Sequence, residues 1–269
     1  MLTPVTDLDA LIASFWPAAQ DVTRSAYPTY ADGVKTYADF AAHLRSAHAS
    51  DWGEVLLHDD DALLLIEAED EAYVSLRLWA KGRQSAALAE ALAWLRAHDA
   101  GYTLWLGFAP ENAEMLAFAR ENGFALLDDS VNWVLPLEGH TPSPADASVR
   151  RVTREEYYAF RAVWTDQTMY WNADRIRDAF DRWTLFITRD GRAAVACMND
   201  AVAPEIFGFQ YRGGYDAAAH RALMAAVIRD GCESGAKHLN YFADHEESGV
   251  MTALGFRRVS DYVCYETKL

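Results

Sequence analysis

Cysteine is scarce in this sequence, and long apolar runs are absent. The three cysteines, Cys197, Cys232 and Cys264, are spaced too widely and irregularly for a disulfide framework or a zinc site. No apolar run approaches the roughly 20 residues that cross a bilayer. The first residues also lack the basic and apolar segments of a secretory signal. We therefore expect a cytoplasmic protein with reduced cysteines, no membrane partner and no metal cofactor.

Basic residues are also few. Lysine and arginine number 24 against 40 aspartates and glutamates, which gives a formal net charge of −16. Binding to nucleic acid needs a surface rich in lysine and arginine, so we expect no nucleic-acid partner. The acidity would steer a cationic or amine-bearing substrate toward the protein, or it only keeps the chain soluble. What is present, 51% hydrophobic and 13% aromatic residues, is typical of a folded soluble protein.

One linker divides the chain. Residues 138–147 contain two prolines and a glycine and few apolar side chains. The predicted order of elements before the linker, β-α-α-β-β-β-α-β-α-β, is repeated after it. Repetition at this scale predicts two domains of one fold, residues 1–137 and 148–269.

Short segments of the two halves can also be placed side by side. Lys81–Ala86 corresponds to Arg212–Ala217, and each precedes a predicted helix. Phe118–Phe124 corresponds to Val250–Phe256, and each ends in Gly-Phe. These matches support a duplicated fold.

A predicted strand over 205–211 leads through adjacent glycines, Gly213 and Gly214, into a helix that begins near Ala217. The first N–H groups of a helix have no internal partner, and the aligned peptide dipoles add partial positive charge there. Glycine lets the backbone approach an anion closely and adopt a positive φ. The stretch therefore predicts a phosphate-type anion site, although most glycine turns before helices only redirect the chain.

This order of elements resembles the GNAT superfamily of acyl-CoA N-acyltransferases in tandem form, over nearly the whole chain. The family motif, Gln/Arg-x-x-Gly-x-Gly/Ala, holds the pyrophosphate of coenzyme A at the start of the main helix. The second half has Tyr215 at the middle glycine of this motif, and the first half has Gln84 there. The resemblance implies, for each half, an α/β (α+β) domain with a mixed, mostly antiparallel central sheet flanked by helices.

The resemblance also implies acetyl-CoA, or coenzyme A, as the co-substrate. The first half departs further from the motif, so we expect the second half to be the cofactor site. The residues that the resemblance assigns to binding there are Phe207, Phe209, Arg212, Gly213, Gly214, Tyr215, Asp216, Ala217 and Asp244.

For catalysis, Glu205 is a candidate base at the start of the predicted strand. It would share a strand face with Phe207 and Phe209, because side chains on a strand alternate. The alternative is a solvated carboxylate at a strand end. Tyr241 and Tyr262 are candidate acids; the alternative for each is an aromatic residue of the core or its rim.

Two functions follow from the sequence. One is acetyl transfer from acetyl-CoA to an amine of a small molecule or peptide. The other is a catalytically inactive ligand-binding or dimerisation scaffold, because Ala119 and Met251 stand where the family has a tyrosine that protonates the leaving thiolate. A homodimer is compatible with either function.

An aromatic cluster lies in the predicted helical region before the sheet of the second half. The resemblance implies that this region forms the wall of the acceptor site; the alternative is that the aromatic side chains pack the helices onto the sheet. The cluster consists of Trp164, Tyr170, Trp171 and Trp183.

Overall fold

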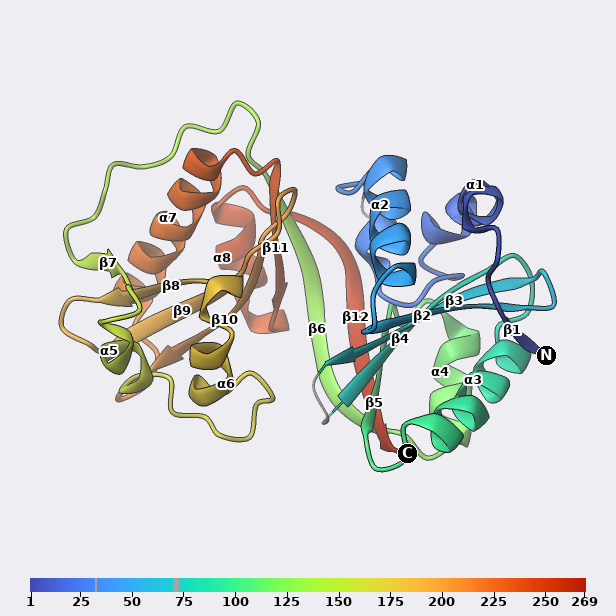
Figure 1. Ribbon diagram of the computed structural model, residues 1–269. Helices are drawn as coiled ribbons and strands as arrows, with labels where there is room; N and C mark the ends of the chain where they lie inside the picture. Colours follow the sequence, from blue (N-terminus) through green and yellow to red (C-terminus); the bar gives the residue numbers. More distant parts are fainter. Residues whose placement is uncertain (32, 70–72) are drawn as a thin grey trace. The chain divides into compact units, whose positions relative to one another are not determined.

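The computed structural model describes residues 1–31, 33–69 and 73–269 (Figure 1). The chain forms two compact units. Unit 1 comprises Met1–Ser130 with Ser260–Leu269, and unit 2 comprises Val131–Val259.

Unit 1 contains a sheet with the strand order β1-β2-β3-β4-β5-β12. Its helices and strands are β1 (Leu2–Pro4), α1 (Leu8–Ala19), η1 (Pro28–Tyr30), α2 (Tyr37–His48), β2 (Gly53–His58), β3 (Ala62–Glu69), β4 (Tyr73–Ala80), α3 (Ser85–His98), β5 (Thr103–Phe108), α4 (Ala113–Glu121) and most of β12 (Arg257–Lys268). The sheet is covered on both faces, which explains the apolar run in β3. Leu64 and Ile66 face the core under α3 and α4, while Leu63 and Leu65 face the core under α1 and α2.

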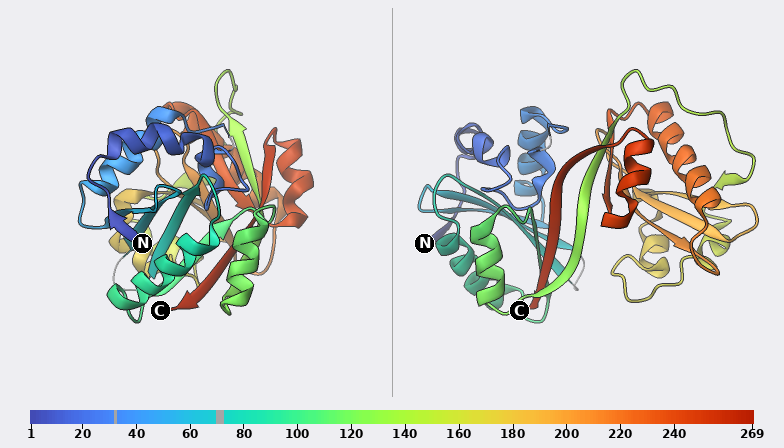
Figure 2. Two further views of the ribbon diagram at one scale, coloured as in Figure 1. Left: turned by 90° about the vertical axis from the view of Figure 1, so that its right-hand side faces the viewer. Right: turned by 180° about the vertical axis from the view of Figure 1, so that it is seen from behind.

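Unit 2 repeats this arrangement with the strand order β6-β11-β10-β9-β8-β7. Its helices and strands are the second part of β6 (Ala125–Pro136), then β7 (Val149–Arg151), α5 (Tyr157–Arg161), α6 (Ala173–Asp178), η2 (Phe180–Arg182), β8 (Trp183–Thr188), β9 (Ala193–Met198), β10 (Glu205–Tyr211), α7 (Ala217–Ser234), β11 (His238–Ala243), η3 (His245–Glu247) and α8 (Ser248–Ala253). Figure 2 shows α7 and α8 on one face of this sheet, with α5 and α6 on the other.

The last strand of each half completes the sheet of the other half. β6 ends the first half in sequence but pairs antiparallel with β11 of unit 2, and β12 ends the second half but pairs antiparallel with β5 of unit 1. Apolar side chains fix this exchange: Val131 and Trp133 join the core under α7, and Val263 and Tyr265 join the core under α3. The units therefore differ from the predicted ranges 1–137 and 148–269 in where the last strands lie.

The element order of both halves is the order that the sequence predicts. Residues 138–147 contain no helix or strand, as predicted for the linker. The Arg229 side chain of α7 binds this segment through the carbonyl oxygens of Ser143 and Pro144. None of the helices formed by the described residues has the length and apolar character required to cross a membrane.

Candidate functional site

The central strands of unit 2 separate in front of the glycine turn. β10 and β11 run parallel, and among the described residues only the start of β10 pairs with the middle of β11, Glu205 with Asn240 and Ile206 with Tyr241. β10 has a register shift between Ile206 and Gly208, where it pairs with β9. A bulge of this kind bends a strand and ends its pairing. Beyond the bulge the described residues form no further pairs between β10 and β11.

The bulge also changes which side chains share a face of β10. Phe207 packs against Trp164 and Trp183 on the α5–α6 side, whereas Phe209 packs on the α7 side with its ring centroid 4.4 Å from that of His220. The prediction that Phe209 shares a face with Glu205 and Phe207 is therefore wrong. The extra residue at the bulge breaks the simple alternation of the strand.

The turn after β10 has the backbone that its glycines allow. Gly213 and Gly214 have φ values of +89° and +102°, and no described atom lies within 4 Å of a Cβ built at either position. A side chain would be strained here, while the open space leaves room for a ligand beside the backbone. Arg212, in the same turn, is exposed. These three residues form a cradle of the kind that fits a phosphate group.

Asp216 and Ala217 start the helix behind this turn. Asp216 is the N-cap of α7, and its Oδ1 accepts the N–H groups of Ala218 and Ala219 at 2.9 and 3.1 Å. The carboxylate therefore binds two of the N–H groups at the start of the helix that were predicted to bind an anionic ligand. Asp216 is a structural cap, and Ala217 is the first helical residue.

Tyr215 stands largely outside the packed interior. Its side chain is 60% exposed, and its ring lies 5.4 Å from the ring of Tyr211 and 5.7 Å from that of His220. The ring therefore sits at the surface beside the turn and is not part of either hydrophobic core.

Beneath the turn lies a buried histidine that sequence reasoning missed. The Nδ1 atom of His220, on α7, is 2.7 Å from the hydroxyl of Tyr211. Burial, together with the nearby Arg221, lowers the pKa of His220, so the ring is neutral at pH 7. Within the part of the chain that the structure describes, its Nε2 atom has no partner. The available signal was a histidine among alanines on the buried side of the first helical turn.

Tyr241 and Glu247 form a second polar pair in the same region. Tyr241 is buried on β11, at the last paired position before the strands separate, and lies near the carboxyl group of Glu247. Burial raises the pKa of both groups. Glu247 was also missed from the sequence, because it stands among exposed acidic residues of η3. Asp244, one of the residues predicted to bind the cofactor, is exposed where β11 ends.

The remaining candidates fall in different places. Glu205 is half-buried at the closed end of the separation, between Met198 and Asn240. Tyr262 belongs to unit 1, where its hydroxyl lies over the Cα atom of Gly107 and its ring is 6.5 Å from that of Tyr27. The structure therefore does not group Tyr262 with the candidates of unit 2, since the exchange of β12 carries it into the other unit.

The predicted acceptor wall is mainly core. Trp164, Trp171 and Trp183 are all at least nine-tenths buried among α5, α6 and the sheet, and only Tyr170 is half-exposed. The packing alternative accounts for the three tryptophans. Among the described residues, no group of three or more histidine, cysteine, aspartate or glutamate side chains is arranged to hold a metal ion.

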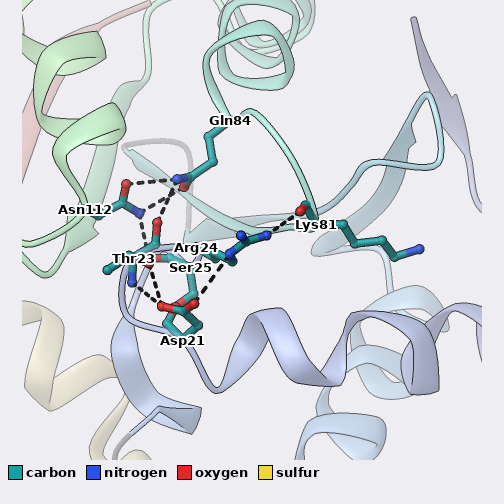
Figure 3. A network of polar contacts seen from close by, with 7 residues as sticks. All are labelled: Asp21, Thr23, Arg24, Ser25, Lys81, Gln84 and Asn112. Atoms are coloured by element: carbon teal, nitrogen blue, oxygen red, sulfur yellow. Dashed lines mark hydrogen bonds and ion pairs between the residues drawn. The ribbon is translucent and has the colours of Figure 1, made fainter.

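In unit 1 the corresponding strands also separate. β4 and β5 pair from Tyr73–Thr103 to Ser75–Trp105 and no further. The turn that follows β4 is closed, however, because Gln84 is only 2% exposed and exchanges two side-chain hydrogen bonds of 2.9 Å with Asn112 (Figure 3). The two halves thus keep the same backbone plan but differ at the turn.

Comparison with known proteins relates this fold to solved structures. No family model matches the sequence, and no curated protein matches it. A GCN5-related N-acetyltransferase from Sphaerobacter thermophilus is similar over 100% of this chain and 95% of its own, with a TM-score of 0.68 and 14% identity. A tandem GNAT protein from the clavulanic acid biosynthesis pathway is similar over 100% and 98%, with a TM-score of 0.59 and 15% identity. A GCN5-related N-acetyltransferase from Kribbella flavida covers 84% and 94%, with a TM-score of 0.55 and 17% identity.

Because the sequence identities are only 14–17%, the similarity to these structures shows the fold alone. The chain has the tandem GNAT fold, and the predicted α/β class with a mixed sheet in each half is confirmed.

Proposed function

We propose that unit 2 binds an acyl-CoA and transfers its acyl group to an amine of a small molecule or peptide. The observation that carries this proposal is the separation of β10 and β11 at a bulge, directly ahead of the open turn at Gly213 and Gly214. Strand edges suit the amide groups of the pantetheine arm, and the turn suits the pyrophosphate. The fold is also that of the N-acetyltransferases named above.

Two residues beside the separation have the chemistry that the transfer needs. The amine nitrogen attacks the thioester carbonyl, so a C–N bond forms, the C–S bond breaks and the amine loses a proton. Glu205, at the closed end, takes that proton directly or through a water molecule. Tyr241, paired with Glu247, returns a proton to the thiolate sulfur. The net charge of −16 favours approach of a cationic amine.

The scaffold alternative has its own support. The positions at which the family carries a tyrosine, Ala119 and Met251, are fully buried and apolar. Neither can donate a proton. Binding of the acyl donor without turnover would favour this alternative.

A thermal-shift experiment with acetyl-CoA and with free coenzyme A tests the proposal. A ligand at a hundredfold excess over its dissociation constant stabilises the folded protein by about 2.7 kcal/mol. We expect this shift in the unaltered chain and its loss in the double variant Gly213→Val, Gly214→Val. Gly191→Val, which also places a side chain at a positive φ but in the β8–β9 turn, is the matched control and should keep the shift. No shift with either ligand at millimolar concentration would contradict the proposal.

A further inference from the structure

The segment after α1 pairs with β4 of unit 1 beyond the point where β4 leaves β5. Ala26 donates its N–H to the carbonyl oxygen of Leu78 at 2.8 Å, and Ala80 donates to the carbonyl oxygen of Arg24 at 3.0 Å. Ser25, between them, forms an antiparallel bridge with Trp79. This segment therefore behaves as a short extra strand on the free edge of β4.

The same segment also reaches the free edge of β5. Tyr27 donates its N–H to the carbonyl oxygen of Gly107 at 2.7 Å. Tyr27 has a φ of +55°, which a residue with a side chain adopts only when its surroundings hold it there. Since pairing of β4 with β5 ends at Ser75 and Trp105, the segment Arg24–Tyr27 fills the opening between the two strands.

The amide pair of Gln84 and Asn112 holds this segment in place. Gln84 Nε2 donates to the carbonyl oxygen of Thr23 at 2.9 Å, and Asn112 Nδ2 donates to that of Ser25 at 3.4 Å (Figure 3). The guanidinium of Arg24 donates to the carbonyl oxygen of Lys81 in the turn after β4. The turn after β4 thus binds the chain itself, through the side chain of Gln84 and the carbonyl oxygen of Lys81.

A carboxylate occupies the start of the following helix. Oε1 of Glu114, on α4, accepts the N–H groups of Gln84 and Ser85 at 2.9 and 2.8 Å, where α3 begins. Burial raises the pKa of Glu114, but these two backbone bonds, together with the Ser85 side chain and the charge of Arg83, outweigh burial and hold the pKa below its usual range. The helix end that would face a phosphate already carries an anion.

We infer that unit 1 contains a substitute for acyl-CoA made from its own chain, and that the protein binds one acyl-CoA, in unit 2. Arg24–Tyr27 takes the place of the pantetheine arm, because both present amide groups to the edges of separated strands. Glu114 takes the place of the pyrophosphate. The identity of the displaced ligand rests on the function proposed above. An occupant in the same chain competes at an effective concentration on the order of millimolar, so a free ligand does not displace it readily.

Two measurements on the full chain test this inference. Isothermal titration with acetyl-CoA should give one site per chain, and none in the Gly213→Val, Gly214→Val variant. Amide hydrogen exchange should show Ala26 and Tyr27 as well protected as the paired strand β5, with protection unchanged when acetyl-CoA is added to saturation. Two sites per chain, or loss of protection at these amides on adding acetyl-CoA, would overturn the inference.

The exchange experiment separates this inference from the proposed function. If acetyl-CoA does not bind at all, the proposed function fails, and protection of the two amides alone decides whether the opening is filled. Exchange at the rate of an open loop would then reject the filled opening. Ala26→Pro, which removes the N–H that Leu78 accepts, should accelerate exchange at Tyr27 and leave exchange in α7 of unit 2 unchanged.

Discussion

Gln84 and Asn112 are 2% and 0% exposed, and each amide nitrogen donates to the other amide oxygen at 2.9 Å. Asn112 is also the N-cap of α4, since its Oδ1 accepts the N–H of Met115 at 3.2 Å. The pair therefore joins the turn after β4 to the turn after β5. Truncating either amide removes two of the hydrogen bonds of its buried partner, and a buried polar atom left without a partner costs more than the bond itself contributes.

We expect Gln84→Ala and Asn112→Ala each to lower the free energy of unfolding by about 2–3 kcal/mol. The double variant should lose clearly less than the sum, because both single variants remove the same pair of bonds. Urea denaturation of the three variants measures this coupling. Gln20→Ala, at an exposed position, is the control and should change stability by less than about 0.5 kcal/mol. Additive losses would show that the two amides act independently.

Gly107 is required because the ring of Tyr262 leaves no space for a side chain at this position. A Cβ at this position would overlap the ring and hydroxyl of Tyr262, at a φ that any residue can adopt. Gly107→Ala should therefore destabilise the protein by about 1–3 kcal/mol, as overpacked interiors do. Gly249→Ala is the matched control, because no described atom lies within 4 Å of a Cβ there; it should be neutral or slightly stabilising. Equal stability of the two variants by urea denaturation would show that the Tyr262 ring moves aside freely.

The sequence predicts local features of this fold better than long-range ones. The repeated order of elements and the glycine turn at Gly213 and Gly214 are recoverable, because helix periodicity and positive φ depend on neighbouring residues. The exchange of β6 and β12 is not, since the alternating pattern of Val131, Trp133 and Leu135 suits the edge of either sheet.

The candidate site shows the same limit. The turn is visible in the sequence, but the bulge in β10 is not, and it reverses the expected side of Phe209. Glu114, His220 and Glu247 acquire their roles only through residues distant in sequence, or through burial. Nothing in their local sequence distinguishes them from solvated side chains.

Glu114 makes acid stability depend on its charge. Its pKa is lower in the folded protein than in the unfolded chain, so its contribution is present above the unfolded pKa of about 4.3 and is lost as the pH falls through the folded pKa. We expect Glu114→Gln to lower stability at pH 7 by about 1 kcal/mol, the usual effect of a lost helix cap, with the difference from the unaltered chain shrinking below about pH 4. Urea denaturation at pH 7 and pH 3.5 measures this. A difference that does not change with pH would show that the carboxylate charge plays no part.

The pKa of His220 is also lowered in the folded protein, but here the favoured form is the neutral one. Leucine, which stands at the equivalent position of α3, is the substitution that tests this. Leu88 lies four residues after the N-cap of α3, as His220 does after that of α7, and Leu88 is fully buried. Because burial lowers the pKa of His220 in the folded state, the unfolded chain binds a proton below about pH 6.5 that the folded protein does not. Stability contributed by neutral His220 is therefore present at pH 7 and decreases as the pH falls below that value.

We expect His220→Leu to reduce the loss of stability between pH 7 and pH 5, by up to about 1.4 kcal/mol per pH unit. Urea denaturation across this range is the measurement. His48→Leu, at an exposed position on α2, is the control and should leave the pH dependence unchanged. If His220→Leu and the unaltered chain lose stability equally on acidification, His220 takes up a proton as readily in the folded protein as in the unfolded chain, and burial does not lower its pKa.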